Sequence, residues 1–169
     1  MNKIILGIIV VVALVVGFYL VSSATPTANG TAHTPAIQVA PDFTLEKLGG
    51  GKIVLADYKG KKPVILDFWT TWCPNCKRDI PRQNEWYKKY KDQIEVIGID
   101  MQEEPSIVQK FVSDLGVVYP VVLDSTGDVA RKYQVAYTNY HVLISKDGNI
   151  VGTIPGDIKE SDFTKLIAL

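Results

Sequence analysis

The sequence predicts a single mixed α/β domain, with helices on both faces of a central β-sheet. Two observations lead to this fold class. Short runs rich in β-branched and aromatic residues alternate with helix-like stretches, and the chain closes with a hairpin followed by a last helix. Roughly 130 residues follow the N-terminal region, which is enough for one hydrophobic core.

The chain opens with an unbroken apolar run, residues 4–21, that contains no charge and no proline. As a helix this run reaches about 27 Å, near the hydrocarbon thickness of a bilayer. Lys3 precedes it and no Lys or Arg follows until Lys47, which predicts a cytoplasmic N-terminus and a domain on the outer side of the cell membrane. A cleaved signal peptide is the alternative, because small residues follow at 22–24. The length of the run favours a retained transmembrane anchor over residues 1–22.

Residues 23–40 are rich in Thr, Ala and Pro and almost uncharged, which predicts a flexible linker in which His33 is simply solvated. The folded domain is therefore expected over residues 41–169.

Strands and helices of this domain can be assigned in chain order from their hydrophobic patterns and turn residues. The three glycines at 49–51 predict the turn of a first hairpin, and Lys-Asp-Gly-Asn at 146–149 predicts that of a last one. The expected strands are 43–45, 53–55, 64–69, 94–100, 121–123, 141–145 and 150–154. The expected helices are 75–90, interrupted by Pro81, 106–115 capped by Ser106, 127–133, and a C-terminal helix capped by Ser161 or Asp162.

Composition excludes several classes of function. Eighteen basic and eighteen acidic residues cancel and form no basic stripe, so nothing indicates nucleic-acid binding. The chain has two cysteines, Cys73 and Cys76, too few for a disulfide-stapled mini-domain. A structural zinc site normally needs a second Cys or His pair, and no such pair is present.

The position of the C-x-x-C pair indicates redox chemistry. It lies where the buried strand 64–69 ends and the next helix begins, and unpaired N–H groups at a helix N-terminus stabilise a thiolate. Cys73, at the mouth of the helix, is expected to be the nucleophile. Cys76, nearly one turn further on, is expected to resolve the mixed disulfide that Cys73 forms with a substrate. Pro74 fits the first helical turn. The alternative is a static disulfide in an exported domain.

The stretch DFWTTWCPNC, residues 67–76, resembles the active-site strand and motif of thioredoxin. Over about 130 residues the chain is similar to the membrane-anchored TlpA/ResA-like branch of that superfamily. The similarity includes APDFTL at 40–45, VYPVVLD at 118–124 with the helix before it, and the closing strands within 133–152. The resemblance implies a thioredoxin fold and a thiol–disulfide oxidoreductase without a cofactor. It also implies exported protein substrates, a membrane protein as electron donor, and a role in disulfide reduction or cytochrome c maturation. The direction of electron flow and the particular substrate stay open.

The resemblance also assigns candidate roles to single residues. Asp67 matches thioredoxin's buried carboxylate, a candidate proton acceptor for Cys76 whose pKa burial is expected to raise. A strand-end residue satisfied by backbone or by lysine is the alternative. Trp72 matches the tryptophan that packs beside the site, and Trp72, Pro74 and Asn139 are candidate substrate-binding residues. Asn139 stands where the family has a cis-proline. Because a non-proline cis bond costs about 2.5–4 kcal/mol, a trans bond is expected there.

Three further hypotheses concern residues around this motif. His141 is either an ordinary strand histidine or a third ligand beside Cys73 and Cys76 in a module that handles copper or zinc. Copper chaperones of this fold use a wider C-x-x-x-C, which favours the enzyme. A peroxidase is disfavoured, because Thr70 fits but Leu66 stands where peroxiredoxins need proline. Residues 103 and 104, both Glu, either line the rim of the site or serve the start of a helix.

Overall fold

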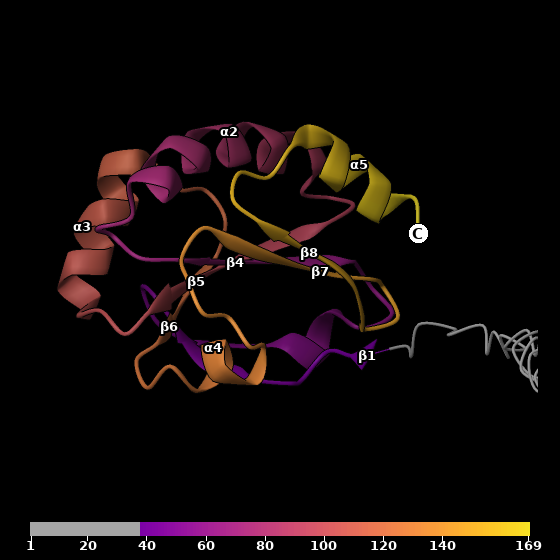
Figure 1. Ribbon diagram of the computed structural model, residues 1–169, viewed down its shortest axis with the longest axis horizontal. Helices are drawn as coiled ribbons and strands as arrows, with labels where there is room; N and C mark the ends of the chain where they lie inside the picture. The colour runs from indigo at the N-terminus through magenta and orange to yellow at the C-terminus, as the bar shows by residue number, and fades with distance from the viewer. Residues whose placement is uncertain (1–37) are drawn as a thin grey trace, which may run out of the picture. The chain divides into compact units, whose positions relative to one another are not determined.

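The computed structural model describes residues 38–169, which form one α/β unit (Figure 1). In this part of the chain eight strands make one sheet in the order β1-β8-β7-β4-β5-β6-β2-β3. The pairs β4–β5 and β5–β6 are parallel, and the other pairs are antiparallel. The strands are β1 (Gln38–Val39), β2 (Thr44–Lys47), β3 (Lys52–Val54), β4 (Val64–Trp69), β5 (Glu95–Met101), β6 (Val121–Asp124), β7 (Tyr140–Ile144) and β8 (Asn149–Pro155).

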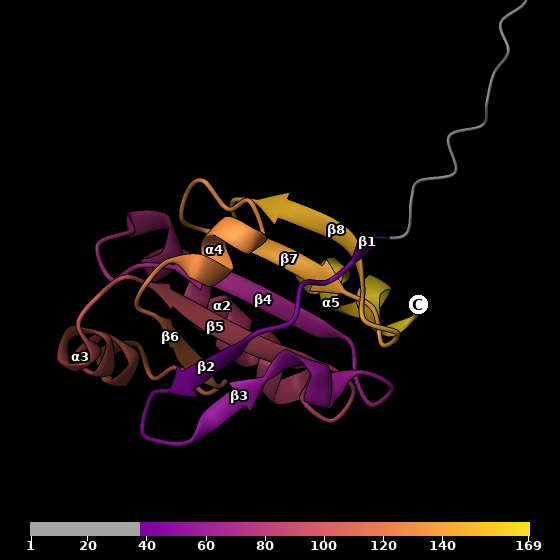
Figure 2. The ribbon, with the colours of Figure 1, turned by 90° about the horizontal axis from the view of Figure 1, so that it is seen from below.

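Helices cover both faces of the sheet, as the sequence predicts. Helices α2 (Pro74–Tyr90), α3 (Pro105–Leu115) and α5 (Glu160–Ile167) lie on one face, and α4 (Asp128–Lys132) lies on the other (Figure 1). A short 3-10 helix, η1 (Leu55–Tyr58), follows β3 directly. Seen from the side of α4, β4 occupies the middle of the sheet (Figure 2).

Alternate residues of β4 serve the two faces, because successive side chains of a strand point to opposite sides. Leu66 and Phe68 belong to the core beneath α4, with Val129 and Tyr133. The alternate residues point to the opposite face, which α2 covers: Ile65 joins the core beneath α5, and Trp69 joins the core beneath α3. Asp67 stands between these two on the same face, so the strand period places a carboxylate against the active-site helix.

The differences from the sequence-based assignment lie at the ends of elements and in two short elements that were not expected, β1 and η1. β1 lies inside the stretch expected as a linker, and its two residues pair with β8. The expected caps are wrong. Helix α3 starts at Pro105 after Glu104, and α5 starts after Lys159, whose backbone N–H donates to Asp162 Oδ2 at 2.9 Å. Proline at a first helical position needs no N–H partner, which moves the start of α3 back by one residue.

No helix within residues 38–169 is both long and apolar enough to cross a membrane. The apolar run 4–21 and His33 lie outside the described residues, so the anchor expected there stays a prediction.

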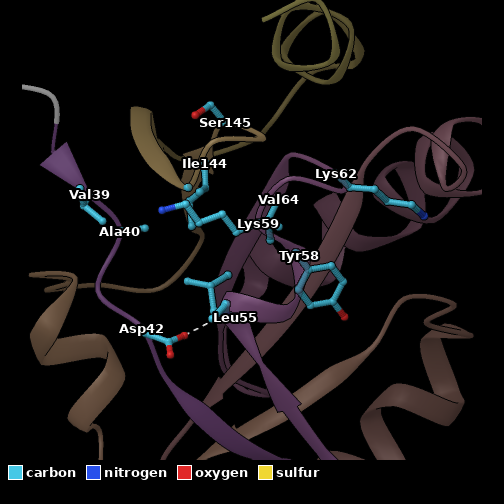
Figure 3. Close-up of a pocket in the computed structure, with 12 residues that line it drawn as sticks. Val39, Ala40, Asp42, Leu55, Tyr58, Lys59, Lys62, Val64, Ile144 and Ser145 are labelled. Atoms are coloured by element: carbon cyan, nitrogen blue, oxygen red, sulfur yellow. Dashed lines mark hydrogen bonds between the residues drawn. The ribbon is translucent and has the colours of Figure 1, made fainter.

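A hollow of about 170 Å³ lies at the start of β4 and the end of β7, lined in part by Val64, Ile144 and Ser145 (Figure 3). Asp42 closes one side, where its Oδ1 accepts a hydrogen bond of 2.9 Å from Ala56 N. The cysteines follow the opposite end of β4, so this hollow is separate from the redox chemistry.

Candidate active site at the carboxyl end of the central strand

Cys73 and Cys76 are joined by a disulfide at the start of α2, with their Cα atoms 5.4 Å apart. Cys73 is the N-cap residue and Pro74 the first helical residue, as expected from the sequence. The N–H of Cys76 donates to Cys73 Sγ at 3.1 Å. One of the unpaired N–H groups of the helix start therefore already points at the sulfur that would carry negative charge after reduction.

The two sulfur-bearing residues are buried, whereas their neighbours are exposed. Cys73 is 3% exposed and Cys76 1%, while Pro74 is exposed and Trp72 is 67% exposed. Trp72 therefore stands at the surface, and Trp69 is the tryptophan that packs into the core. Trp69 stacks on Phe111 with ring centroids 5.0 Å apart.

Gly98 on β5 permits this packing of Trp69. A Cβ atom at Gly98 would lie 2.8 Å from Trp69 Nε1, closer than side-chain atoms approach in folded proteins. The absence of a side chain there lets the indole ring lie on the sheet beside the disulfide.

A groove of about 510 Å³ opens beside the exposed indole of Trp72. Tyr137 and Thr138, from the loop before β7, also line it, as do Met101 at the end of β5 and Gln102 after it. Trp72 and Tyr137 are both largely exposed. The groove therefore offers aromatic surface to a partner next to the disulfide.

Behind the disulfide lies a buried cluster of polar side chains. Asp67 and His141 are register partners across β4 and β7, and Asp67 Oδ1 lies 3.2 Å from His141 Nε2. Tyr119 donates its hydroxyl to Asp67 Oδ2 at 3.2 Å. Asp79 Oδ2, from α2, lies 3.7 Å from the same His141 nitrogen, and Gln83 Nε2 lies 3.2 Å from it. All five residues are buried, so their polar and charged groups have little contact with water.

Burial and neighbouring charge oppose each other in this cluster. Burial alone lowers the pKa of His141, but the charges of Asp67 and Asp79 and the hydrogen bond to Asp67 outweigh it, and the net pKa is raised. Burial raises the pKa of Asp79, although the N–H of Ile158 and the charge of His141 act against it. Burial, followed by the Asp67 charge, raises the pKa of Tyr119, which therefore stays a neutral donor.

The sequence analysis did not identify three members of this cluster, Asp79, Gln83 and Tyr119. A signal for the first two was present. Positions 76, 79, 80 and 83 follow the i, i+3, i+4, i+7 spacing of one helix face, so a buried Cys76 implies that Asp79 and Gln83 are buried beside it. Tyr119 gave no such signal, because it lies in the irregular stretch before β6.

Asn139 is 3% exposed and its side-chain N–H is bonded within the protein, and its expected contact with substrate stays a prediction. Its Nδ2 donates to Asp157 Oδ1 at 3.0 Å, and its carbonyl accepts from Gly156 N at 2.8 Å. The described residues contain no cis peptide bond, so the trans expectation is confirmed, and Asn139 adopts a left-handed φ of 58°. Asparagine is among the few residues that adopt this conformation readily. Asp157 also pairs with Arg78 and Arg82, each at 2.9 Å.

Glu103 supports the loop that leads into Cys73. Its carboxylate accepts hydrogen bonds from both the backbone N–H and the hydroxyl of Thr71. Asp100 lies beneath it, fully buried, and accepts from Glu103 N at 3.2 Å. Burial and hydrogen bonding with Glu103 raise the pKa of Asp100 to about 8. Of the two uses weighed for the acidic pair, Glu103 serves the rim of the site and Glu104 precedes the first residue of α3.

Within residues 38–169 no three His, Cys, Asp or Glu side chains are arranged to hold a metal ion. The sequence left open that His141 is a third metal ligand beside the two sulfurs. In the structure its imidazole faces Asp67 and Asp79.

Known proteins share this fold and chemistry. Residues 37–153 match the model of the AhpC/TSA family. The chain is 40% identical over 119 residues to the thiol-disulfide oxidoreductase ResA of Bacillus anthracis, a match that covers 70% of this chain and 68% of that protein. It is 38% identical over 132 residues to ResA of Bacillus subtilis (strain 168), covering 76% and 73%.

Solved structures agree. A putative thiol:disulfide interchange protein DsbE from Chlorobium tepidum superposes with a TM-score of 0.71 at 27% identity, covering 78% of this chain and 94% of that one. StoA from Bacillus subtilis superposes with a TM-score of 0.66 at 25% identity, covering 76% and 97%. The chain therefore belongs to the AhpC/TSA family of thioredoxin-fold proteins and is a thiol–disulfide oxidoreductase.

Proposed function

We propose that this oxidoreductase works outside the cytoplasm, where its Cys73–Cys76 dithiol reduces disulfides in exported proteins. The observation that carries the proposal is the position of Cys73 as the N-cap of α2, with the N–H of Cys76 directed at its sulfur. A thiolate formed there is stabilised by the helix start, which favours Cys73 as the attacking group.

The reaction proceeds in two exchanges. The Cys73 thiolate attacks one sulfur of a substrate disulfide, forms a mixed disulfide and releases the other substrate sulfur as a thiolate. Cys76 then attacks Cys73 Sγ, closes the enzyme disulfide and releases the second substrate sulfur. Asp67 is proposed to accept the proton that Cys76 gives up. The proposal is supported by the position of its carboxylate on the face of the sheet that α2 covers.

The groove between Trp72 and Tyr137 is the proposed binding place of the substrate chain. Its position beside the disulfide and its exposed aromatic surface support this role. Pro74, also exposed at the helix start, is a further proposed contact.

The location and the electron donor are proposals from sequence. The apolar run 4–21 is proposed to anchor the chain, with the residues from 23 up to the start of β1 as a tether that leads to the folded domain. A membrane protein is proposed to re-reduce the enzyme disulfide. The similarity to ResA supports either general disulfide reduction or a role in cytochrome c maturation.

Trapping of the mixed disulfide tests the assignment of the two cysteines. Reduced Cys76→Ala should accumulate a covalent complex with an insulin disulfide, because the resolving thiol is missing. The matched variant, Cys73→Ala, should accumulate none. A complex formed equally well by both variants, or only by Cys73→Ala, contradicts the assignment.

A further inference from the structure

The buried pair formed by His141 and Asp67 has a consequence for the exchange reaction. We propose that His141 is a positioning residue, whose imidazolium pairs with the Asp67 carboxylate and orients it to take the proton of Cys76. This inference rests on the proposed role of Asp67 as proton acceptor. Neither the resemblance to thioredoxin nor the comparisons assign any role to His141.

The first argument is the contact itself. His141 and Asp67 stand directly opposite each other on β7 and β4, where side chains of an antiparallel pair are neighbours. Their side chains are 0% and 2% exposed, and the nearest nitrogen and oxygen are 3.2 Å apart. Burying a carboxylate in this way is costly unless a positive group or strong hydrogen-bond donors face it. Tyr119 supplies one donor, and His141 is the cationic group within reach.

The second argument is the pairing of charges around the imidazole. Asp79, from α2, is the other acidic group near His141, and it has a cationic partner of its own, because Arg82 lies 3.5 Å from Asp79 Oδ1. Asp157, in the loop after β8, pairs with Arg82 as well. On the β8 side His141 faces Ile154, which carries no charge. Asp79 therefore has Arg82 as a second cationic neighbour, whereas His141 lies nearer to Asp67, at 3.2 Å, than to Asp79, at 3.7 Å.

The third argument is the position of the thiol. Cys76 and Asp79 lie three residues apart on the buried face of α2, and His141 lies between Asp79 and Asp67. The polar cluster therefore begins one helical turn from the resolving cysteine.

The resolving step then balances as follows. Cys76 attacks Cys73 Sγ, the S–S bond to the substrate breaks, and the substrate sulfur leaves with the electron pair. The two electrons of the enzyme dithiol have passed to the substrate disulfide, and the proton of the Cys76 thiol moves to Asp67. Once Asp67 is neutral, one of the two acidic charges that raise the pKa of His141 is gone, and the imidazole releases its proton more readily.

The two histidines of the chain make a direct test possible. In a full-length protein carrying His33→Gln, His141 is the single imidazole, and its ring nitrogens can be followed by NMR against pH. We expect His141 to stay protonated above the ordinary midpoint near 6.5, and Asp67→Asn to lower that midpoint by about one unit or more. The inference is overturned if the imidazole is neutral at pH 6, or if Asp67→Asn leaves its midpoint unchanged. This test does not require that a His141 variant folds.

Kinetics supply the second readout, as the rate at which a preformed mixed disulfide is resolved. His141→Gln keeps a hydrogen-bond donor but not the charge, and should slow this step about tenfold at neutral pH and shift its pH midpoint. In an Asp67→Asn background the same substitution should change the rate less than twofold, because its effect passes through Asp67. An equal loss in both backgrounds, or an unchanged pH profile, reduces His141 to a packing residue and overturns the inference.

The two proposals fail differently. If Asp67→Asn leaves the resolving rate unchanged, the proposed role of Asp67 is wrong, and the inference falls with it. If Asp67→Asn slows the step and His141→Gln does not, only the inference about His141 is wrong.

Discussion

Glu103 holds Thr71 with both carboxylate oxygens, one accepting the backbone N–H and the other accepting the hydroxyl at 2.6 Å. The contact joins the end of β5 to the loop that carries Cys73, two residues further along the chain. It shows how residues on a neighbouring strand fix the active-site loop from the side.

Glu103→Ala should therefore loosen this loop. We expect a loss of about 1–3 kcal/mol in the free energy of unfolding, because two donors on Thr71 lose their partner in a half-buried setting. Glu104→Ala is the matched control, since Glu104 is exposed and makes no side-chain cap bond, and it should change stability by less than about 0.5 kcal/mol. Urea unfolding of both variants measures the difference. Equal losses would mean that the Thr71 contact adds nothing.

Asp100 should make stability fall as pH rises. Its folded-state pKa of about 8 lies above its unfolded value near 3.9, so the folded protein binds the extra proton between these limits. That stabilisation is complete below the unfolded pKa and is lost as pH rises toward 8. Asp100→Asn mimics the protonated acid and should flatten this part of the curve. Thermal unfolding from pH 4 to 9 checks it, and identical slopes for the two proteins would contradict the assignment.

The two thiols of the reduced protein should react unequally. We expect iodoacetamide to label Cys73 well below pH 8.5, the ordinary thiol midpoint, and well before Cys76, because Cys73 caps the helix and Cys76 lies one turn inside it. Mass spectrometry of the labelled peptide over a pH series gives both rates. Equal labelling with a midpoint near 8.5 would remove the reason to assign Cys73 as nucleophile.

Asn139 should not tolerate proline. Proline fixes φ near −65°, whereas Asn139 has a φ of 58°, so Asn139→Pro forces the loop before β7 to rebuild. We expect the free energy of unfolding to fall by about 2 kcal/mol or more. The hydrogen bond from the Asn139 side chain to Asp157 is also lost. Asn139→Gly adopts the same φ without strain, and loses only the side-chain bond. If Asn139→Pro is as stable as Asn139→Gly, the left-handed conformation is not required here.

The anchor is tested on cells. If residues 4–21 span the membrane, carbonate washing should leave the protein in the membrane fraction, and protease added to spheroplasts should degrade the domain. A chain without residues 1–22 should be released as soluble protein. Recovery of a soluble product that begins near residue 25 would support the cleaved signal peptide instead.

The strands and the redox motif could be predicted because they depend on local rules. The run 64–69 is buried on both faces, the glycines at 49–51 turn the first hairpin, and the C-x-x-C pair sits at a strand end; each of these patterns is visible over a few residues. The observed bounds of the expected strands differ from the expected ones by at most two residues at either end, which is ordinary for element ends.

The remainder depended on contacts between distant parts of the chain. Nothing near position 141 indicates that its imidazole faces Asp67, since 74 positions separate them and only the β4–β7 register brings them together. The left-handed turn at Asn139 depends likewise on Asp157, which lies beyond the two strands that follow, β7 and β8. Such pairings follow from sheet topology, and no local pattern encodes them.

Two kinds of charge contact support this active site, and ionic strength should separate them. Arg78 and Arg82 reach Asp157 at the surface, with side chains 58%, 48% and 30% exposed, so dissolved ions screen these pairs over a Debye length of about 8 Å in physiological salt. His141 and Asp67 are sealed from those ions. As salt concentration changes around the protein, the loop that follows β8 should loosen or tighten against α2 while the charge pair behind the disulfide stays the same. The surface pairs and the buried pair can thus respond to the surroundings independently.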